Sequence, residues 1–589
     1  MKRKPIPRAL STMWLIPLIV LGFSKLQRSA GAEQHPLHLS VDDDWDLNKP
    51  FTANTTANLV FATASSLLQS APNLRYRNGH TIVPGIVPSG TLLYHGRGDK
   101  NIPDVEWVAF EPEVSYGFCR QFGGPNSCWM HTFAVARPLK IIYFDGAGAS
   151  KVEDGAMDSQ DLFTWGEIKP ECVLEDALRI QKMCDWGKTL GLDGFVRSGA
   201  FPEIMLCDFT SLTVVSSQHL KSTPFKTVPD PDLAPTPTFR IPARSVPINS
   251  DYIDHFITVT ERFSQYPGLT HVRLDLTRLV SFYDQRLAPS LVAVRSDKPR
   301  LEHRLLGITK EDILRVRRHL EEQILDTSWS SLENVGYRPT GLDWRTYLYS
   351  TVDKYGKALE DIRNIVNSTT VATRSSTTQR AKDAFRLLES LVQLFVLSSV
   401  SPPTNSDSGN NDTDTAWASS VFRECALTHE QSIITTIGPV SLTNSEQLLC
   451  DSVKGTTREL CRVLTKMWAD GVREGLSGLF DDHPDEDMVS DPGHSESKPR
   501  DVLSVSNPTW ASALLETWKN DLGDLMKWLD WGVWVRCKPA CKELESCYLP
   551  TWPFSVGNVS QPVWHADNPQ PRCLRKLAPF TYADEYSSE

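Results

Sequence analysis

Three short stretches place side chains that could do chemistry at the ends of strand-like runs. The stretch GTLLYHGR is apolar until His95, which is followed by Gly96. Ser115 and Tyr116 lie in an amphipathic segment after the run EWVAF, and Glu203 begins the apolar run EIMLCDF. A histidine can hydrogen-bond a hydroxyl, an aromatic ring can stack on a planar group, and a carboxylate can stabilise developing positive charge. A carboxylate that begins an apolar strand must face solvent, a cleft or a partner, so Glu203 is the leading catalytic candidate.

In order and local texture, residues 86–217 resemble the ADP-ribosyltransferase superfamily. In that superfamily a His, an aromatic or Ser, and a Glu come from three successive strand motifs, to which YHG, SYGF and DGF…EIMLCDFTSL are similar. The resemblance implies a split antiparallel or mixed sheet, with NAD as the substrate and no metal. Glu203 would then stabilise an oxocarbenium-like state on the ribose. His95, Gly96, Ser115 and Tyr116 would bind NAD.

This family pattern is incomplete, and it leaves two hypotheses from different classes. Pro202 precedes Glu203, and no second Glu or Gln stands just before it, so the acceptor stays unknown. The first hypothesis is NAD-dependent ADP-ribosyl transfer or NAD glycohydrolase activity. The second is a non-catalytic secreted or cell-wall-associated binding or structural protein with a degenerate scaffold. Catalysis requires His95, Tyr116 and Glu203 to line one cleft, so their geometry separates the two hypotheses.

Other motifs and the overall charge exclude several classes of function. The 589 residues carry 61 basic and 72 acidic side chains, a net charge of −11, which argues against a general nucleic-acid binder. There is no HExxH, P-loop or GxSxG motif. The run LKIIYFDGAGAS imitates the start of a dinucleotide fold, but Lys151 occupies its third glycine position.

The N-terminus predicts a secreted glycoprotein. Lys2, Arg3 and Lys4 precede the apolar run WLIPLIVLGF, and an A-x-A site ends at Ala32, which predicts a signal peptide over residues 1–32. That run is about half of the ~20 residues that a membrane span needs, so no stable span is expected. The alternative is an uncleaved signal anchor that faces the extracellular side. N-x-[ST] sequons predict glycosylation at Asn54, Asn367, Asn411 and Asn558.

Secretion makes disulfides the expected state of the 12 cysteines. Cys119 and Cys128 bracket RQFGGPNS, whose glycines and proline favour a reversing loop, so we expect them to pair. Cys172 and Cys184 flank a predicted helix that would hold them about 18 Å apart, so they should not pair. Four cysteines near the C-terminus are further disulfide candidates, because their spacing fits no common zinc template: Cys537, Cys541, Cys547 and Cys573.

Composition divides the chain into an α+β domain followed by a mostly α-helical, disulfide-containing region. We expect a polar segment at 33–58, the α+β domain at 59–221 and a Pro/Thr-rich linker at 222–250. Helical regions at 251–400 and 416–480 flank a disordered linker at 401–415, and an acidic disordered loop at 481–507 precedes a Trp/Cys-rich helical segment at 508–589. The whole layout also resembles uncharacterised secreted fungal proteins.

Apolar periodicity predicts the main helices of the second half. Thr309 and Asp312 look like a capping box before a helix whose apolar face is Ile313, Val316, Leu320 and Ile324. Further helices are expected at 173–190, 343–366, 381–400, 445–468 and 510–531. The tryptophans of the last helix could form a sugar-binding platform, but apolar residues spaced by three and four favour a buried face: Ala511, Leu515, Trp518, Leu522, Leu525 and Leu529.

Overall fold

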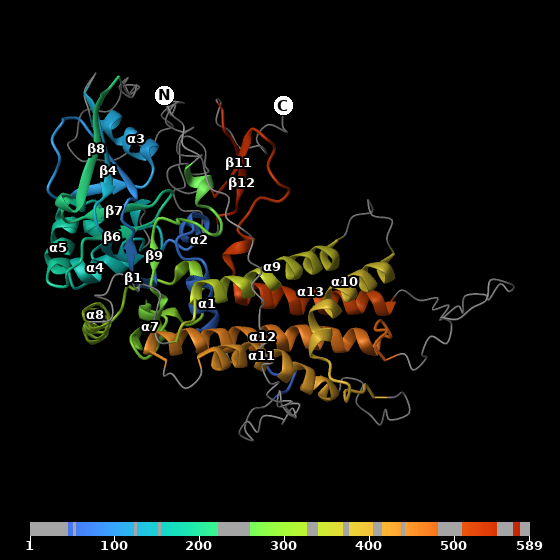
Figure 1. Ribbon diagram of the computed structural model, residues 1–589. Coiled ribbons are helices and arrows are strands. Elements are labelled where there is room, and N and C mark those ends of the chain that lie inside the picture. Colours follow the sequence, from blue (N-terminus) through green and yellow to red (C-terminus); the bar gives the residue numbers. More distant parts are fainter. Residues whose placement is uncertain are drawn as a thin grey trace, which may run out of the picture. The chain divides into compact units, whose positions relative to one another are not determined.

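A computed structural model describes residues 45–50, 55–122, 127–150, 155–221, 259–326, 340–368, 376–403, 415–437, 442–480, 509–549 and 569–577. The described residues from Asp46 onward belong to one compact unit (Figure 1). The predicted signal peptide, most of both predicted disordered segments, the linker at 222–250, and the sequons at Asn54, Asn411 and Asn558 lie outside these residues. Asn367 is described, and it is exposed at the end of a helix.

The N-terminal half is built on one mixed sheet of ten strands. The strand order is β10-β1-β5-β6-β7-β3-β2-β4-β8, with β9 also paired to β1. Only β5 and β6 run parallel, and the other recorded pairs are antiparallel. The strands are β1 Thr81–Val87, β2 Leu92–Arg97, β3 Glu106–Ala109, β4 Cys128–Val135, β5 Leu139–Phe144, β6 Gly194–Arg197, β7 Glu203–Leu206, β8 Leu212–Leu220, β9 Arg273–Leu274 and β10 Val280–Ser281.

The two last strands of this sheet were not expected from the sequence. β9 and β10 follow the linker, inside the region predicted as helical, and both pair with β1. They are two residues long, too short for the period-2 pattern that identifies a strand. The segment after the linker therefore returns to the N-terminal sheet.

Helices cover the sheet and supply its main core. The helices of this half are α1 Ala57–Ser65, α2 Ser70–Arg75, α3 Pro112–Phe122, α4 Asp158–Thr164, α5 Asp176–Lys188, α7 Ser290–Arg295 and α8 Lys310–Leu325. Phe144, Phe195 and Met205 of the central strands pack in one cluster with apolar residues of α4, α5 and α8. The predicted apolar face of α8 is buried in this cluster. Burial of such side chains contributes roughly 1.5–3 kcal/mol each.

Long helices form the C-terminal half, and Figure 1 shows α9, α12 and α13 running alongside one another. The elements are α9 Trp344–Asn367, α10 Thr377–Val392, α11 Ser419–Ile437, α12 Asn444–Arg473, α13 Thr509–Leu529, β11 Glu545–Tyr548 and β12 Arg572–Arg575. α12 is buried along most of its length because α1, α10, α11 and α13 all contact it. All six predicted face residues of α13 are buried, so this face belongs to the core. No described helix is both long and apolar enough to cross a membrane.

Side-chain caps begin α8, α9, α10 and α12, with one correction to the prediction. The Thr309 hydroxyl accepts from the backbone N of Asp312, but the Asp312 carboxylate accepts from the N and Oγ of Ser290 instead of closing the predicted box. The complete capping box is at Thr443 and Glu446, at the start of α12. The sequence analysis missed that box.

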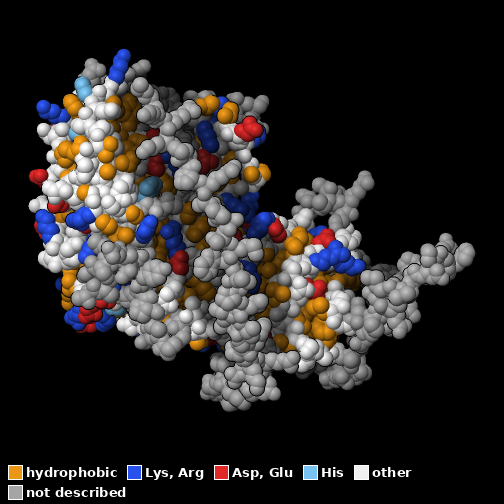
Figure 2. All heavy atoms as spheres, in the orientation of Figure 1, with side chains coloured by type: hydrophobic (Ala, Val, Ile, Leu, Met, Phe, Trp, Pro, Cys, Tyr) orange, Lys and Arg blue, Asp and Glu red, His pale blue; other side chains and the backbone are white. Residues whose placement is uncertain are grey.

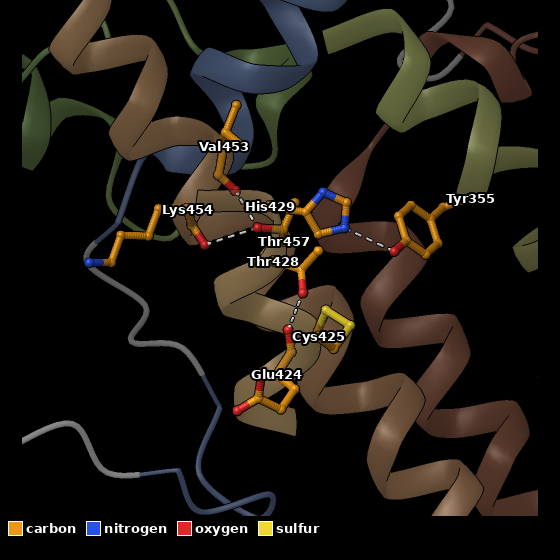
Figure 3. The surroundings of a disulfide bond; sticks show 9 residues. Tyr355, Glu424, Cys425, Thr428, His429, Val453, Lys454 and Thr457 are labelled. Atoms are coloured by element: carbon orange, nitrogen blue, oxygen red, sulfur yellow. Dashed lines mark hydrogen bonds between the residues drawn. A yellow bond between two sulfur atoms is a disulfide. The ribbon is translucent and has the colours of Figure 1, made fainter. Parts of the chain in front are cut away.

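Five disulfides link described cysteines. Cys119 and Cys128 are joined across the loop where the sequence predicts a bridge, with Cα atoms 4.9 Å apart. Cys184 pairs with Cys207 and leaves Cys172 as a thiol. The remaining pairs are Cys425–Cys461, which joins α11 to α12 (Figure 3), and Cys537–Cys547 and Cys541–Cys573 near β11 and β12. The sulfurs of Cys537, Cys541 and Cys573 cluster closely, but all three are in disulfides and supply no thiolate.

Candidate functional site

Glu203 lies inside the protein, where its charge is neutralised by a buried arginine. It begins β7, its residue is 6% exposed, and its Oε1 accepts from Arg197 Nε at 2.7 Å. The same guanidinium donates to Asp176 of α5 at 3.2 Å. The carboxylate therefore faces a partner, which was one of the three environments expected for it.

The sheet register separates His95 from Glu203. Glu203 pairs with Ala109, and Ala109 pairs with Tyr94, so these three side chains share one face of the sheet. His95 follows Tyr94 directly, and successive side chains of a strand point to opposite faces. The catalytic hypothesis requires His95 and Glu203 to line one cleft, and this geometry does not bring them together.

The environment of His95 is a buried aromatic cluster on the other face. Its Nδ1 lies 2.7 Å from the carbonyl of Trp107, and its ring lies near His131 and Phe209. Because a carbonyl only accepts, Nδ1 carries the proton and Nε2 carries a lone pair. Burial lowers the pKa of His95 to about 4, so the ring is neutral at ordinary pH.

Gly96, Ser115 and Tyr116 have a packing relation that explains the glycine after the histidine. Ser115 and Tyr116 lie on the helix α3, and not on a strand as the family pattern would have it. A Cβ on Gly96 would lie 1.9 Å from the backbone oxygen of Ser115. Gly96 is therefore the residue that allows α3 to pack directly on β2.

A different group of polar residues surrounds a pocket at the edge where β1 begins and β5 ends. We call it the polar pocket, and the space within it that a water-sized group can occupy is about 20 Å³. It combines residues from α1, α2, both strand ends, the segment after β10, and the turn at Arg300. The lining residues are Thr63, Ser66, Pro72, Asn73, Tyr76, Asn78, His80, Asp145, Tyr283 and Arg300.

Two glycines bring the two sides of this edge together. A Cβ on Gly79 would lie 2.2 Å from the backbone oxygen of Asp145. Gly146 has φ +81°, and a Cβ there would lie 2.6 Å from the backbone oxygen of Arg77. The close approach lets Asp145 Oδ1 accept from the backbone N of Thr81 at 2.8 Å. Only glycine fits both positions without moving the backbone.

His80 lines the pocket and is held in one tautomer with an unpaired nitrogen. The residue is 3% exposed, and its Nδ1 lies 2.5 Å from the carbonyl of Asn78. Nδ1 must therefore donate, which leaves a lone pair on Nε2. Nε2 has no hydrogen-bond partner among the described residues. Tyr283 stacks on the imidazole, with ring centroids 4.4 Å apart and planes 12° apart.

The side chain of Asn78 presents a second unpaired acceptor. Its Nδ2 donates to the carbonyl of Leu301 at 3.1 Å, which fixes the orientation of the amide. Its Oδ1 is buried, and no described residue donates to it. An unpaired buried acceptor costs about 1–3 kcal/mol, so each of these two atoms calls for a donor from outside the protein.

The pocket lining also includes a paired charge. The guanidinium of Arg300 lies 3.8 Å from the ring centroid of Tyr76, and it reaches Asp530 Oδ2 at 3.4 Å and Thr63 Oγ1 at 3.2 Å. The hydroxyl of Tyr76 also donates to Asp530. Arg300 and Asp530 therefore balance one another at the pocket wall.

Burial sets the protonation of the groups on the pocket. Burial, and next the charge of Arg295, holds the pKa of His80 well below its usual value, so its ring is neutral. Burial raises the pKa of Asp145 to about 7, although backbone N–H donors from Thr81 and His80 oppose the rise. Asp145 is therefore close to half-ionised at neutral pH.

Sequence reasoning missed this pocket, although one of its signals was visible. Asp145 belongs to the run that was set aside as an imitation of a dinucleotide fold, and it follows a strand in which every residue except Lys140 is buried. Tyr283 and Arg300 come from beyond the linker, and they reach His80 only because Phe282 N donates to the carbonyl of His80 at 2.8 Å. No local pattern predicts that pairing.

Comparisons with known proteins find uncharacterised fungal relatives. A family model described as the YPL277C N-terminal domain matches residues 48–127 and 121–233. The Uncharacterized protein YOR389W of Saccharomyces cerevisiae is 24% identical over 94% of this chain and 93% of its own length. The Uncharacterized protein YPL277C of the same yeast is 31% identical over 27% of this chain and 41% of its own length. The chain is similar to uncharacterised fungal proteins. No solved structure matches it.

The family-model match covers only part of the polar pocket. It includes Asn78, His80 and Asp145 but ends before Tyr283 and Arg300. The match to YOR389W extends over nearly the whole chain.

Proposed function

We propose that the protein is a secreted, disulfide-stabilised binding protein that holds a small polar ligand in the polar pocket. The observation that carries this proposal is that two residues of the pocket lining, His80 and Asn78, each have a buried acceptor, Nε2 and Oδ1, without a partner among the described residues. The space within the pocket is about 20 Å³, which is enough for one small polar group of a ligand.

Secretion is supported by the sequence and by the cysteine pairs. The predicted leader ends at Ala32, and five disulfides within the described residues are typical of an oxidising compartment. N-terminal sequencing of protein from the culture medium should begin at Glu33. Recovery of the full-length chain only in membranes would favour the signal anchor.

The NAD-dependent activity stays a prediction of the family resemblance and is not part of this proposal. It depends on His95, Tyr116 and Glu203 facing one cleft, and the sheet register places His95 and Glu203 on opposite faces. The binding hypothesis needs no such cleft. Nicotinamide release by the purified protein measures the alternative directly.

A thermal-shift experiment tests ligand binding at the pocket. Protein purified from the medium is heated with members of three chemical classes: hydroxyl compounds, carboxylates and amines. We expect at least one class to raise the Tm of the wild type, because a ligand that binds only the folded state stabilises it. His80→Phe should lose that shift, since the phenyl ring can still stack on Tyr283 but has no Nε2.

A matched variant separates the pocket from general effects on folding. His429 is a half-buried histidine beside a tyrosine, and its Nε2 lies 3.0 Å from the hydroxyl of Tyr355 (Figure 3). It lies in the helical half and does not line the polar pocket. His429→Phe should therefore keep the ligand-induced shift. The proposal is wrong if no class shifts the wild type, or if both variants respond equally.

A further inference from the structure

Four cysteines gather at the C-terminal hairpin formed by β11 and β12 (Figure 1). Cys547 lies directly opposite Cys573 in the register of this hairpin, while Cys537 and Cys541 come from the segment before β11. The sulfur atoms of Cys537, Cys541 and Cys573 lie within 4.8 Å of one another, and that of Cys547 is bonded to Cys537. We call these four residues the cysteine cluster.

The sulfurs of the cysteine cluster are spaced almost as they would be around a zinc ion. A Zn–S bond is about 2.3 Å long, so neighbouring sulfurs of a tetrahedral site are about 3.8 Å apart. Shifts of roughly 1–2 Å would bring the four sulfurs from the two disulfides to that arrangement. The spacing along the sequence fits no common zinc template, but the pairing of β11 with β12 brings the four residues together.

Contacts other than the disulfides hold the hairpin against the rest of the protein. Arg536 and Lys538 both contact the carboxylate of Glu360 on α9. Tyr548 and Leu574 of the hairpin are only 2% and 3% exposed. These contacts do not depend on the sulfur–sulfur bonds, so we expect the cluster to stay assembled when its disulfides open.

The surroundings of the cluster favour negatively charged sulfur. The segments 536–548 and 572–576 contain two acidic residues, Glu543 and Glu545. They contain six basic residues: Arg536, Lys538, Lys542, Arg572, Arg575 and Lys576. Nearby positive charge stabilises thiolates, which are the form of cysteine that binds metals. The backbone N of Cys537 also donates to the sulfur of Cys547 at 2.8 Å, and such a bond favours the charged form.

The two disulfides of the cluster are also the most accessible ones among the described residues. All four of its cysteines are half-buried. The cysteines of the other three disulfides are between 0% and 5% exposed: Cys119, Cys128, Cys184, Cys207, Cys425 and Cys461. A reductant must reach a sulfur atom to attack it, so mild reduction should open the cluster and leave the buried disulfides closed.

We propose that the cysteine cluster is a redox-dependent zinc site, with two disulfides when it is oxidised and one Zn²⁺ when it is reduced. Two equivalents of a dithiol reductant deliver four electrons and four protons to the cluster, and each equivalent becomes a disulfide itself. The four thiols then bind Zn²⁺ as thiolates and release four protons, while the oxidation state of the metal does not change. In an oxidising compartment the disulfide form prevails, so zinc binding belongs to the chain in reducing surroundings. This inference does not depend on the polar pocket.

Metal analysis of the full-length wild-type protein tests whether the reduced cluster binds zinc. The protein is treated with dithiothreitol without denaturant, separated from the reductant under anaerobic conditions, mixed with Zn²⁺ and desalted. We expect one Zn²⁺ per chain after reduction and none in the oxidised protein. With Co²⁺ in place of Zn²⁺, we expect the absorption bands of tetrahedral cobalt bound to thiolates.

Alkylation and peptide mapping locate the metal in the same wild-type samples. Without metal, the reduced protein should be alkylated at the four cysteines of the cluster and at the free Cys172, and not at the buried disulfides. Zn²⁺ should protect the four cysteines of the cluster and leave Cys172 reactive. Because this comparison uses wild-type protein, it does not depend on the folding of a variant.

A double variant and a matched control assign the binding to the cluster. Cys541→Ser combined with Cys573→Ser removes one disulfide and two of the four ligands, so the reduced protein should lose its bound zinc. Cys172→Ser removes a half-buried thiol outside the cluster and should keep it. The inference is wrong if the reduced wild type binds no zinc, if bound zinc leaves the cluster open to alkylation, or if the double variant binds zinc as the wild type does.

Discussion

Replacing Glu203 by Gln tests whether this carboxylate is structural or catalytic. Its Oε1 lies 2.7 Å from Arg197, and the two side chains are 7% and 1% exposed. Gln keeps the shape and removes one of the two negative charges that face the guanidinium. Breaking a buried ion pair costs about 3–5 kcal/mol because the remaining charge loses its compensation. Asp176 stays within 3.2 Å of Arg197, so we expect a loss at the lower end, about 3 kcal/mol.

Equilibrium unfolding in urea with the disulfides intact measures this loss. Glu516→Gln is the matched control, because Glu516 is 60% exposed and pairs with Lys519 at 3.1 Å on the surface of α13. An exposed pair contributes at most about 1 kcal/mol, so the control should change little. The structural role would be refuted if Glu203→Gln were as stable as the wild type. If the wild type also released nicotinamide and this variant did not, the catalytic role would be restored.

Three further predictions follow from particular contacts. Gly79→Ala should destabilise the protein in thermal unfolding, because its Cβ would lie 2.2 Å from the backbone oxygen of Asp145. Gly523 in α13 has open space around it, so Gly523→Ala should instead stabilise the protein by about 0.5–1 kcal/mol. Burial lowers the pKa of His429 to about 4 from 6.5, so between these pH values the folded state binds fewer protons than the unfolded state. The free energy of unfolding therefore decreases as the pH falls from about 6.5 to 4. Between pH 7 and pH 4, the free energy of unfolding in urea should decrease by about 3 kcal/mol less for His429→Phe than for the wild type. Equal decreases for the two proteins would contradict this pKa. Alkylation of the native protein should modify Cys172 and spare Cys450, because Cys450 is buried and burial raises its pKa to about 11. Peptide mapping that shows Cys172 in a disulfide would contradict the five cysteine pairs described above.

The sequence predicted the elements whose signal is local. The face of α13 and that of α8 were correct because apolar residues recur at helical spacing, and these residues are buried in the structure. The division into a sheet-rich first part and a mostly helical, disulfide-containing second part was likewise confirmed. The start of α12 was predicted to within one residue, but its N-cap, Thr443, was not recognised.

The candidate site depended on long-range relations that the sequence does not display. His95 and Glu203 were grouped by their order along the chain, and a single residue of strand register decides which face each occupies. Arg300 lines the polar pocket and contacts Asp530, which is 230 residues away in the sequence. Gly79 and Gly146 are the local traces of the pocket, but a glycine beside a polar residue is also what an ordinary turn contains.

Figure 2 shows acidic and basic side chains interspersed on one face of the molecule. A mixed surface of this kind keeps a protein soluble without attracting ligands of one charge. Under the proposed function, recognition of a ligand depends on the polar pocket.

The most direct test of the central claim is a high-resolution crystal structure of the purified protein with the compound that raises its Tm. We predict hydrogen-bond donors of the ligand about 2.7–3.2 Å from His80 Nε2 and Asn78 Oδ1, with Nδ1 of His80 still on the carbonyl of Asn78. A pocket that contains only water, or a side-chain arrangement in which both acceptors have found partners within the protein, would contradict the claim.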